Sequence, residues 1–464
     1  MRIIDHDKIL NELNGKLETS KAGIREILAK GRELHGIDYR EVLELLHVDE
    51  AGLLEEVFAT ARHIKNEIYG NRLVLFAPLY VSNLCNNECV YCAFRSSNKK
   101  LARKVLTQEE VGEETEVLLS RGHKRVLLVA GESYPDEGLE YVFKCIETIY
   151  SVRLPKANIR RINVNVAPLS VDEFKQLHEY KIGTYQLFQE TYHEETYGKL
   201  HIAGRKRDYN WRLEAVHRAF EGGFDDVGIG ILFGLADWRY EILALLQHIN
   251  KLEKSYGIGP HTISVPRLEP ALGSDISRNP PYPVSDADFR KIIAVLRIAV
   301  PYTGIILSTR ESAKMRREAF GLGISQISAG SRANPGGYMH NEPEESDAGS
   351  QFFLGDHRPL QEVIRDIVAH GYIPSFCTGC YRLGRVGGDF MDLARPGLIK
   401  NHCLPNGIYS FAEYLEDYAD DALKKSGYGL INEITRNGVA DDGMKLAIRD
   451  NIEKIIGGER DVYF

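Results

Sequence analysis

Six of the seven cysteines stand in two groups whose spacing is typical of metal or cluster binding. The first group has the spacing C-x3-C-x2-C and consists of Cys85, Cys89 and Cys92. The second has the spacing C-x2-C-x22-C and consists of Cys377, Cys380 and Cys403. Clustered cysteines in a reducing compartment usually serve metal binding or catalysis. The remaining Cys145 lies in an apolar helix-like run, which predicts a small buried hydrophobic residue.

The first group favours an iron–sulfur cluster with one open position. Three thiolates can hold three irons of a 4Fe–4S cube and leave the fourth iron free to bind a small molecule. A structural zinc ion normally takes four protein ligands, and no fourth cysteine or histidine lies close by in the sequence. We therefore expect Cys85, Cys89 and Cys92 to hold a 4Fe–4S cluster.

Two kinds of site remain open for the second group. His402 could complete a zinc site with Cys377, Cys380 and Cys403. A second three-cysteine iron–sulfur cluster fits better beside a first one, and its open iron would again be a place for chemistry.

The elements that must position these cysteines alternate between strand-like and helix-like runs from about residue 73 to 371. The strand-like runs are 72–81, 124–131, 160–168, 183–191, 225–234, 261–270, 304–311 and 324–331. The helix-like runs are 107–122, 139–152, 171–181, 211–223, 239–257, 286–300, 313–323 and 360–372. Eight such units predict an α/β fold, a (β/α)8 TIM barrel with its active site at the C-terminal ends of the strands.

Helical patterns flank this barrel on both sides. We expect an N-terminal helical extension (1–70), the barrel (71–371) and a C-terminal helical domain holding the second iron–sulfur cluster (372–464). In the last of these, 413–426 and 431–457 each have a helical pattern. The Gly-, Pro- and acid-rich stretch 333–352 predicts a long exposed loop.

Composition narrows the partners and the compartment. The formal net charge of -8 argues against nucleic acid or an anionic membrane as the main partner. No stretch approaches the length of apolar residues that a membrane span needs. The charged N-terminus lacks the apolar core of a secretion signal, so we expect a cytoplasmic protein.

The first cysteine group, with Tyr91 before its last cysteine, resembles the signature of the radical S-adenosylmethionine (SAM) superfamily. Ala130-Gly131-Glu132 is similar to the family's Gly-Gly-Glu turn, with alanine in place of the first glycine. The resemblance implies that Glu132 binds the SAM ammonium group.

Further positions resemble SAM contacts of the same superfamily. Glu190 is similar to an acidic contact, and Arg212 to the arginine that pairs with the SAM carboxylate, although a solvated helix arginine is the alternative for Arg212. The glycines of 228–234 resemble the motif on the adenine side, where missing side chains allow a close backbone approach.

The second cysteine group and its surroundings, PSFCTGCYRLGRVG and CLPNGIYSFAEYLEDYAD, resemble the radical SAM tyrosine lyases that mature di-iron hydrogenases. That family's reaction starts when the reduced first cluster cleaves SAM to a 5′-deoxyadenosyl radical. L-tyrosine is then cleaved to p-cresol and dehydroglycine, which becomes carbon monoxide and cyanide at the second, auxiliary cluster. The resemblance also implies an additional labile iron, a free cysteine at that cluster, an electron donor of ferredoxin or flavodoxin type, and other hydrogenase maturation proteins as partners.

Residues outside the cysteine groups complete the expected site. Arg310 resembles the arginine that holds the substrate carboxylate, which a planar two-pronged donor suits; a salt bridge within the barrel is the alternative. Ser328 and Ser331 could bond the same substrate or be structural. His261 resembles the ligand of the labile iron, although a lone histidine is more often structural. Because His261 begins a strand, we expect it, and with it the second cluster, at the opposite mouth of the barrel.

Two other functions remain open at this point. A 2-iminoacetate synthase of thiamine biosynthesis would share the barrel and the tyrosine cleavage without the second cluster. A noncatalytic iron–sulfur scaffold would have no use for Glu132, Glu190 and Arg212.

Overall fold

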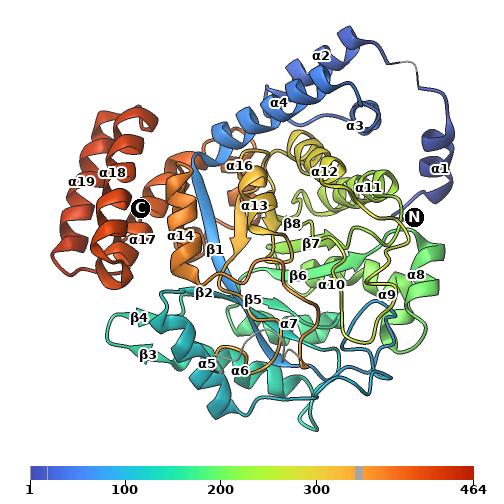
Figure 1. The fold of residues 1–464 in the computed structure, drawn as a ribbon, viewed down its shortest axis with the longest axis horizontal. Coiled ribbons are helices and arrows are strands. Elements are labelled where there is room, and N and C mark those ends of the chain that lie inside the picture. Colours follow the sequence, from blue (N-terminus) through green and yellow to red (C-terminus); the bar gives the residue numbers. More distant parts are fainter. Residues whose placement is uncertain (1, 18, 340–347) are drawn as a thin grey trace.

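The structure, a computed structural model, describes residues 2–17, 19–339 and 348–464. Its centre is a closed barrel of eight parallel strands (Figure 1). In chain order they are β1 (Arg72–Ser82), β2 (Arg125–Ala130), β5 (Arg161–Asn165), β6 (Tyr185–Glu190), β7 (Val227–Ile231), β8 (Thr262–Ser264), β9 (Gly304–Leu307) and β10 (Gln326–Ser328). The barrel closes where β10 pairs with β1, in the register Val74 to Gln326. The predicted (β/α)8 fold is confirmed, because each expected strand-like run contains one of these strands.

Helices surround the barrel. They are α5 (Gln108–Ser120), α6 (Leu139–Ser151), α7 (Val171–Glu179), α8 (Glu194–Leu200), α9 (Tyr209–Leu213), α10 (Ala215–Glu221), α11 (Trp238–Tyr256), α12 (Asp286–Ala299), α13 (Ala313–Phe320) and α14 (Leu360–Ala369). The single helix expected over 211–223 is wrong, since α9 and α10 divide this stretch. The side chain of Arg218 donates to the Trp211 carbonyl (2.6 Å), the acceptor that a continuous helix would offer to Ala215.

The first part of the chain forms four helices, α1 (His6–Asn14), α2 (Lys21–Gly31), α3 (Tyr39–Leu46) and α4 (Ala51–Tyr69). They pack on the outer helices of the barrel, with α4 against α12 and α1 against α11. The main hydrophobic core runs without a break from Ile4 through the barrel to Ile455. The division at residues 70 and 371 therefore stays a prediction.

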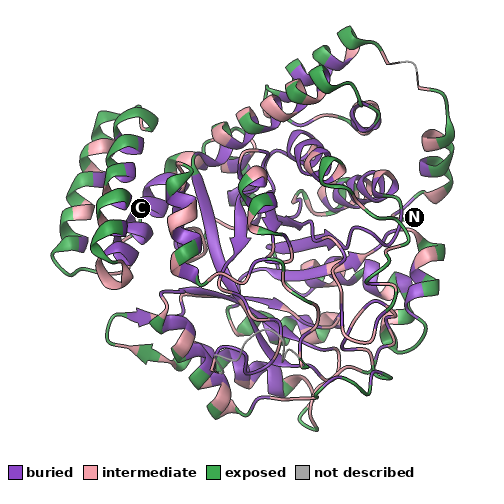
Figure 2. Ribbon diagram, in the orientation of Figure 1, coloured by how far each residue is buried: buried purple, intermediate pink, exposed green. Residues whose placement is uncertain are grey.

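The last part of the chain adds a strand and five helices. They are β11 (Ile373–Ser375), α15 (Gly379–Arg382), α16 (Gly387–Ala394), α17 (Lys400–Tyr418), α18 (Asp421–Gly438) and α19 (Asp442–Ile456). The outer faces of α18 and α19 are exposed (Figure 2). The expected helical stretches 413–426 and 431–457 are each interrupted. New helices start where Asp420 accepts from the Leu423 N–H (2.9 Å) and Asp441 from the Met444 N–H.

Strand β11 was not expected from the sequence, and it decides where the second cysteine group lies. It pairs in parallel with Arg72–Val74, the N-terminal end of β1. Cys377 follows two residues after β11, whereas Cys85 follows the C-terminal end of β1. A strand rises about 3.3 Å per residue, so the two cysteine groups lie on the order of 30 Å apart along the barrel.

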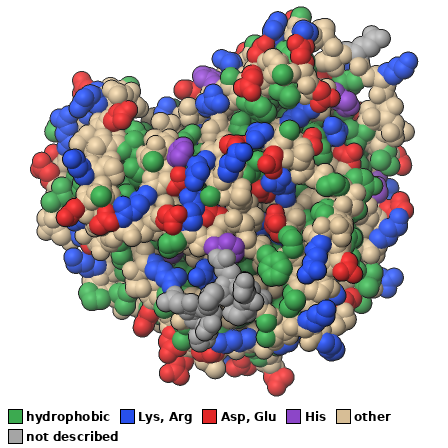
Figure 3. Space-filling view, viewed as in Figure 1, with side chains coloured by type: hydrophobic (Ala, Val, Ile, Leu, Met, Phe, Trp, Pro, Cys, Tyr) green, Lys and Arg blue, Asp and Glu red, His purple; other side chains and the backbone are tan. Residues whose placement is uncertain are grey.

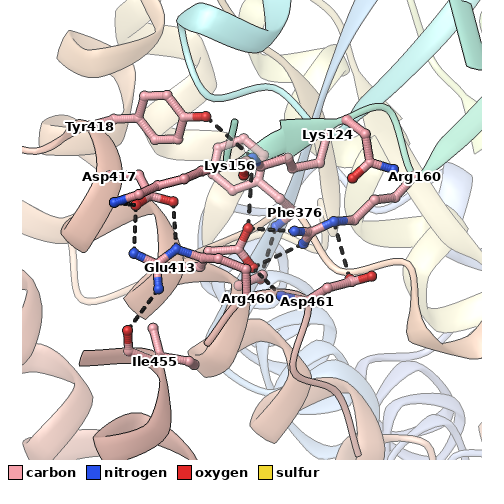
Figure 4. A network of polar contacts seen from close by, with 12 residues as sticks. Lys124, Lys156, Arg160, Phe376, Glu413, Asp417, Tyr418, Ile455, Arg460 and Asp461 are labelled. Carbon is pink, nitrogen blue, oxygen red and sulfur yellow. Dashed lines mark hydrogen bonds and ion pairs between the residues drawn. The ribbon is translucent and has the colours of Figure 1, made fainter. Parts of the chain in front are cut away.

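A buried ionic network joins the barrel to α17 (Figure 4). Glu413 on α17 accepts from Arg160 Nη1 (3.0 Å) and from the Asp461 N–H (3.1 Å). Lys124 Nζ lies 3.7 Å from the same carboxylate, and both side chains are under 5% exposed. Beside it, Asp417 binds Arg460 (2.6 Å). Because Lys124 and Arg160 immediately precede β2 and β5, and Arg460 and Asp461 lie near the end of the chain, the network fixes α17 against the N-terminal mouth of the barrel.

The surface shows no dominance of one charge sign on the face seen in Figure 3, where basic and acidic side chains alternate. Within the described part of the chain, no helix has both the length and the apolar character to cross a membrane. The short hairpin of β3 (Arg153–Leu154) and β4 (Ala157–Asn158) and the 3-10 turn η1 (Arg205–Arg207) lie outside the barrel strands.

Candidate active site

The first cysteine group lies in the loop that follows β1, against the turn after β2. A Cβ atom on Gly131 would meet the Leu84 carbonyl oxygen at 2.1 Å, so only glycine lets the two backbones pass. This close approach brings Glu132 beside the cysteine loop, where Asn87 donates to its carboxylate (2.7 Å). The alanine at position 130 is the buried last residue of β2 and leaves this turn intact.

A cavity of about 1140 Å³, open at its mouth, occupies the C-terminal end of the barrel. Its lining includes these predicted site residues: Tyr91, Cys92, Glu190, Arg212, Arg310, Ser328 and Ser331. Cys85 and Cys89 pack beside it in two small apolar clusters, each of which also contacts Cys92. Burial raises the pKa of Cys92 to about 11, so an iron that binds there must displace a proton.

Four charged side chains, each no more than 15% exposed, form a cluster beside the cysteine loop. Arg212 binds Glu132 (2.8 Å) and lies 3.5 Å from Glu190, while Lys206 Nζ lies 2.6 Å from Glu190. Burial alone would raise the pKa of each carboxyl group, but the two cations outweigh it and hold the pKa of Glu132 and of Glu190 below the usual range. The solvated alternative for Arg212 is wrong, because its side chain is 4% exposed.

Glu190 has an unusual backbone conformation at this site. Its φ of 72° is left-handed, and the pairing of β6 with β7 shifts register between Phe188 and Glu190. Glu241 of α11 holds the next residues, since its buried carboxyl accepts from the Thr191 hydroxyl and from the Tyr192 N–H (2.8 Å). The outer helix thereby keeps the end of β6 turned toward the cavity.

Arg310 offers a cation to this cavity. It forms no ion pair with any residue that the structure describes, and its guanidinium lies flat on Phe352, 3.3 Å from the ring centroid. Burial lowers its pKa, yet arginine stays charged at neutral pH. The alternative of a salt bridge within the barrel is therefore wrong for the described residues, and a carboxylate is the ligand that such an arginine suits.

The two predicted serines differ in their surroundings. The Ser328 hydroxyl accepts from the Thr309 N–H (3.1 Å) and so has a structural partner. The Ser331 hydroxyl lines the same cavity, is buried, and has no hydrogen-bond partner among the described residues. A buried polar atom without a partner costs stability unless a ligand satisfies it, which suits a substrate contact at Ser331.

Tyr91 contributes packing and one hydrogen bond. Its hydroxyl lies 2.8 Å from His201 Nε2, and the two rings meet edge to face. Both side chains are buried, so Tyr91 fixes the cysteine loop against the segment that ends α8.

The second cavity, of about 490 Å³, lies at the N-terminal mouth of the barrel. Its lining includes Cys377, Cys380, Cys403, His261, Arg72 and Arg125. The Cys380 thiol donates a hydrogen bond to Cys403, which also lies beside Arg72, so the pKa of Cys403 is lowered while that of Cys380 is raised. Arg125 donates to the Cys377 carbonyl (3.2 Å). Two arginines and three thiols that line one cavity suit an anionic iron–sulfur cluster.

His402, the residue that could complete a zinc site, does not line the second cavity. Its ring lies against Phe464, with 5.8 Å between centroids. Across residues 2–17, 19–339 and 348–464, no three Cys, His, Asp or Glu side chains are grouped so as to hold one metal ion. A zinc ion gathers its ligands in one tetrahedron, whereas a 4Fe–4S cube takes its thiolates at separate irons.

Several residues that line the two cavities were not predicted from the sequence. Lys206 belongs to the basic run GRKR, in which nothing marks it as buried. Arg72 and Arg125 each begin a strand, where an arginine is usually solvated. Glu269 also lines the first cavity, and burial raises its pKa to about 7. Only the tertiary structure brings these charges to the cysteines.

Known proteins are similar to this chain in sequence and in fold. Residues 79–246 match the Radical SAM superfamily, and residues 264–373 match the Biotin and Thiamin Synthesis associated domain. The 2-iminoacetate synthase of Escherichia coli is 31% identical over 388 residues, which are 83% of this chain and 97% of the relative.

Two solved structures are similar over almost the whole chain. One is HydG, a maturase of the [FeFe]-hydrogenase, with 47% identity, a TM-score of 0.95 and 100% of both chains covered. The other is the FeFe-hydrogenase maturase HydG from Carboxydothermus hydrogenoformans, with 42% identity, a TM-score of 0.84, and coverage of 96% of this chain and 97% of that one. With its barrel, its SAM-type cysteine loop and this similarity along its full length, the chain belongs to the radical SAM superfamily and, within it, to the HydG family of [FeFe]-hydrogenase maturases.

Proposed function

We propose that this protein is a radical SAM carbon–carbon lyase that cleaves L-tyrosine to p-cresol and dehydroglycine. Carbon monoxide and cyanide for the hydrogenase active site would then form at its second cysteine site. The observation that carries the proposal is the pair of cysteine-lined cavities at the two mouths of one barrel, with Arg310, which forms no ion pair within the described part of the chain, in the first.

In the first cavity, the cluster held by Cys85, Cys89 and Cys92 together with SAM supplies a 5′-deoxyadenosyl radical when both are bound. Glu132 and Glu190 are ionised at neutral pH, because their pKa values are lowered, and can accept from the SAM ammonium group. Arg212 is placed to meet the SAM carboxylate from the same cluster of charges, and Tyr91 holds the cysteine loop.

The substrate would be held on the opposite side of the same cavity. Arg310 binds the tyrosine carboxylate with its two-pronged donor, and Ser331 and Ser328 donate to the same amino acid. Apolar side chains such as Phe76, Leu127 and Ile306 complete the lining and keep water from the reacting atoms.

In the second cavity, Cys377, Cys380 and Cys403 would hold the auxiliary cluster. His261 would bind the labile iron, which leaves with its new ligands as the product. A free cysteine would complete the iron's coordination. The electron donor is expected to be a ferredoxin or flavodoxin, and the acceptors of the product other hydrogenase maturation proteins.

A 2-iminoacetate synthase activity is the second candidate, because the relative from Escherichia coli is 31% identical over 83% of the chain. A 2-iminoacetate synthase activity would leave the second cavity, in which three thiols meet two arginines and His261, without a role. A noncatalytic scaffold would leave Arg310 and the unpartnered Ser331 hydroxyl without a role.

The test is an anaerobic turnover assay with the iron- and sulfide-reconstituted protein, dithionite, SAM and L-tyrosine, in which p-cresol and carbon monoxide are followed together. We expect both products from the unchanged protein. The double variant Cys377→Ala/Cys380→Ala should form p-cresol without carbon monoxide, and Cys89→Ala should form neither. Cys145→Ala is the matched control, since Cys145 is buried in α6 outside both cavities and should leave both products unchanged.

Absence of p-cresol from the unchanged protein, although SAM is cleaved, would show that tyrosine is the wrong substrate. Release of p-cresol without carbon monoxide from the unchanged protein would instead favour the 2-iminoacetate synthase activity.

A further inference from the structure

We infer that Asp226 is a positioning residue for iron at the second cysteine site, acting by holding His261 in one orientation and one tautomer. The inference rests on the proposed role of His261 as the ligand of the labile iron. Asp226 itself does not line the cavity, so it would act through the histidine.

The two side chains meet at the N-terminal mouth of the barrel. Asp226 immediately precedes β7 and His261 immediately precedes β8, and these strands are neighbours in the sheet. The backbone joins them as well, since the His261 N–H donates to the Val227 carbonyl (2.9 Å). His261 Nδ1 lies 3.1 Å from Asp226 Oδ2.

The surroundings leave this carboxylate as the acceptor for Nδ1. Asp226 is 2% exposed, and among the described residues neither His261 Nδ1 nor either Asp226 oxygen has a fully formed hydrogen bond, so the 3.1 Å approach of Nδ1 to Oδ2 is the contact that can satisfy them. The other polar neighbours of Asp226 are Thr184 and Arg161, both of which can donate to the carboxylate. A carboxylate held in this way accepts the Nδ1 proton of the imidazole, and Nε2 then keeps its lone pair.

Aromatic rings fix the plane of the imidazole. Phe390 of α16 stacks on His261 with 4.2 Å between centroids and 25° between planes, and Tyr381 of α15 lies at 5.9 Å and 21°. With Nδ1 turned to Asp226, which does not line the cavity, Nε2 is the nitrogen left free for the cavity that His261 lines together with Cys380 and Cys403. Neutral imidazole is a good ligand for ferrous iron, and a carboxylate on its second nitrogen both orients the ring and raises its basicity.

The experiment uses the full chain with both clusters reconstituted and the labile iron removed by a mild chelator. Ferrous iron is added back in steps, and its binding is followed by the electron paramagnetic resonance signal of the second cluster and by the iron bound per protein. The variants are Asp226→Ala, Asp226→Asn, His261→Ala and, as the matched control, Asp225→Ala, which removes the exposed carboxylate next in the chain. Thermal unfolding checks that each variant folds.

We expect Asp226→Ala to weaken ferrous iron binding about 10- to 100-fold, the usual cost of losing such a partner of a metal-bound histidine. Asp226→Asn should fall between this variant and the unchanged protein, because its amide keeps an acceptor oxygen of similar shape. His261→Ala should bind iron at least as weakly as Asp226→Ala, and Asp225→Ala should bind it normally.

Two results would overturn the inference in distinguishable ways. If His261→Ala lowers iron affinity while both folded Asp226 variants bind like the unchanged protein, Asp226 has no positioning role and the proposed iron site stands. If His261→Ala itself binds iron normally, His261 is not a ligand, and the inference fails together with that part of the proposed function.

Discussion

At the scale of single residues, the first cavity brings together charges that are already paired and polar groups that are not. Glu132, Glu190, Arg212 and Lys206 satisfy one another beside the first cysteine loop. Arg310 and the Ser331 hydroxyl remain without such partners among the described residues. Arg310 is half-buried, and a cation removed from water in this way without a counterion among the described residues is costly, so its presence in the cavity favours an anionic ligand there.

Replacement of Arg310 by lysine tests this assignment. Lysine keeps the charge but loses the two-pronged geometry, and one charge-assisted hydrogen bond is worth about 1.5 to 3 kcal/mol. We expect the KM for L-tyrosine in p-cresol formation to rise about 10- to 100-fold, while cleavage of SAM in the absence of tyrosine continues. Arg278→Lys, at an exposed position outside the cavity, is the control. An unchanged KM in Arg310→Lys would remove Arg310 from the substrate site.

At the scale of elements, the outer helices of the barrel hold the strand ends that carry the site. Helix α11 does so through Glu241, whose buried carboxyl accepts from the residues just after Glu190. Strand β11 anchors the cysteine loop at the other mouth, because its pairing with the first residues of β1 places Cys377 there. Each functional loop is thus anchored by an element that contributes nothing to the chemistry itself.

The contact of Glu241 predicts a pH dependence of stability. Burial raises the pKa of Glu241 to about 7, above its unfolded value near 4.5, so the folded protein retains a proton that the unfolded chain loses. This contribution is fully present below about pH 4.5 and is lost as pH rises toward 7, by at most about 3 kcal/mol. Glu241→Gln, which cannot ionise, should show a smaller fall in melting temperature between pH 5 and pH 7.5.

One control and one contradicting outcome complete this test. Glu195→Gln removes an exposed carboxylate and should keep the pH dependence of the unchanged protein. A melting temperature of Glu241→Gln that follows that of the unchanged protein at every pH would show that Glu241 is ionised in the folded state throughout.

At the scale of the whole molecule, the second cysteine site is formed between the barrel and the last part of the chain, including α17. Arg160 and Lys124 come from the barrel and Glu413 from α17, all nearly buried (Figure 4). Removing one partner of such a network leaves the remaining charges buried and unpaired, which usually costs about 3 to 5 kcal/mol. The network therefore holds α17 against the barrel, and the second cavity depends on this contact.

Replacement of Glu413 by alanine should lower the melting temperature and weaken the second site first. We expect carbon monoxide formation to fall more than p-cresol formation, because the first cavity lies at the other mouth. Glu416→Ala on the same helix is the matched control. Glu416 pairs with Lys424, and the two side chains are 21% and 33% exposed, so this substitution should cost less than about 1 kcal/mol of stability. Equal losses in the two variants would contradict a special role for the buried network.

The sequence by itself determined the strand–helix alternation, and with it the barrel and the mouth at which Cys85, Cys89 and Cys92 stand. Periodicity and turn residues are local signals, and a parallel alternation of eight units leaves few topologies open. The burial of Cys145 in α6 was predicted on the same local grounds and is confirmed. The helix breaks at Glu214 and Ala419 were not predicted, because side-chain contacts to backbone carbonyls and new helix caps decide them.

Only the tertiary structure decided which charges meet. Arg212 of α9 reaches Glu132, 80 positions away, at the C-terminal end of the barrel, and Asp226 reaches His261, 35 positions away, because β7 and β8 are neighbouring strands. Strand β11 has three residues, too few for a periodic signal, yet its pairing places the second cysteine group at the N-terminal mouth. Such contacts depend on register and closure, which no local pattern in the chain encodes.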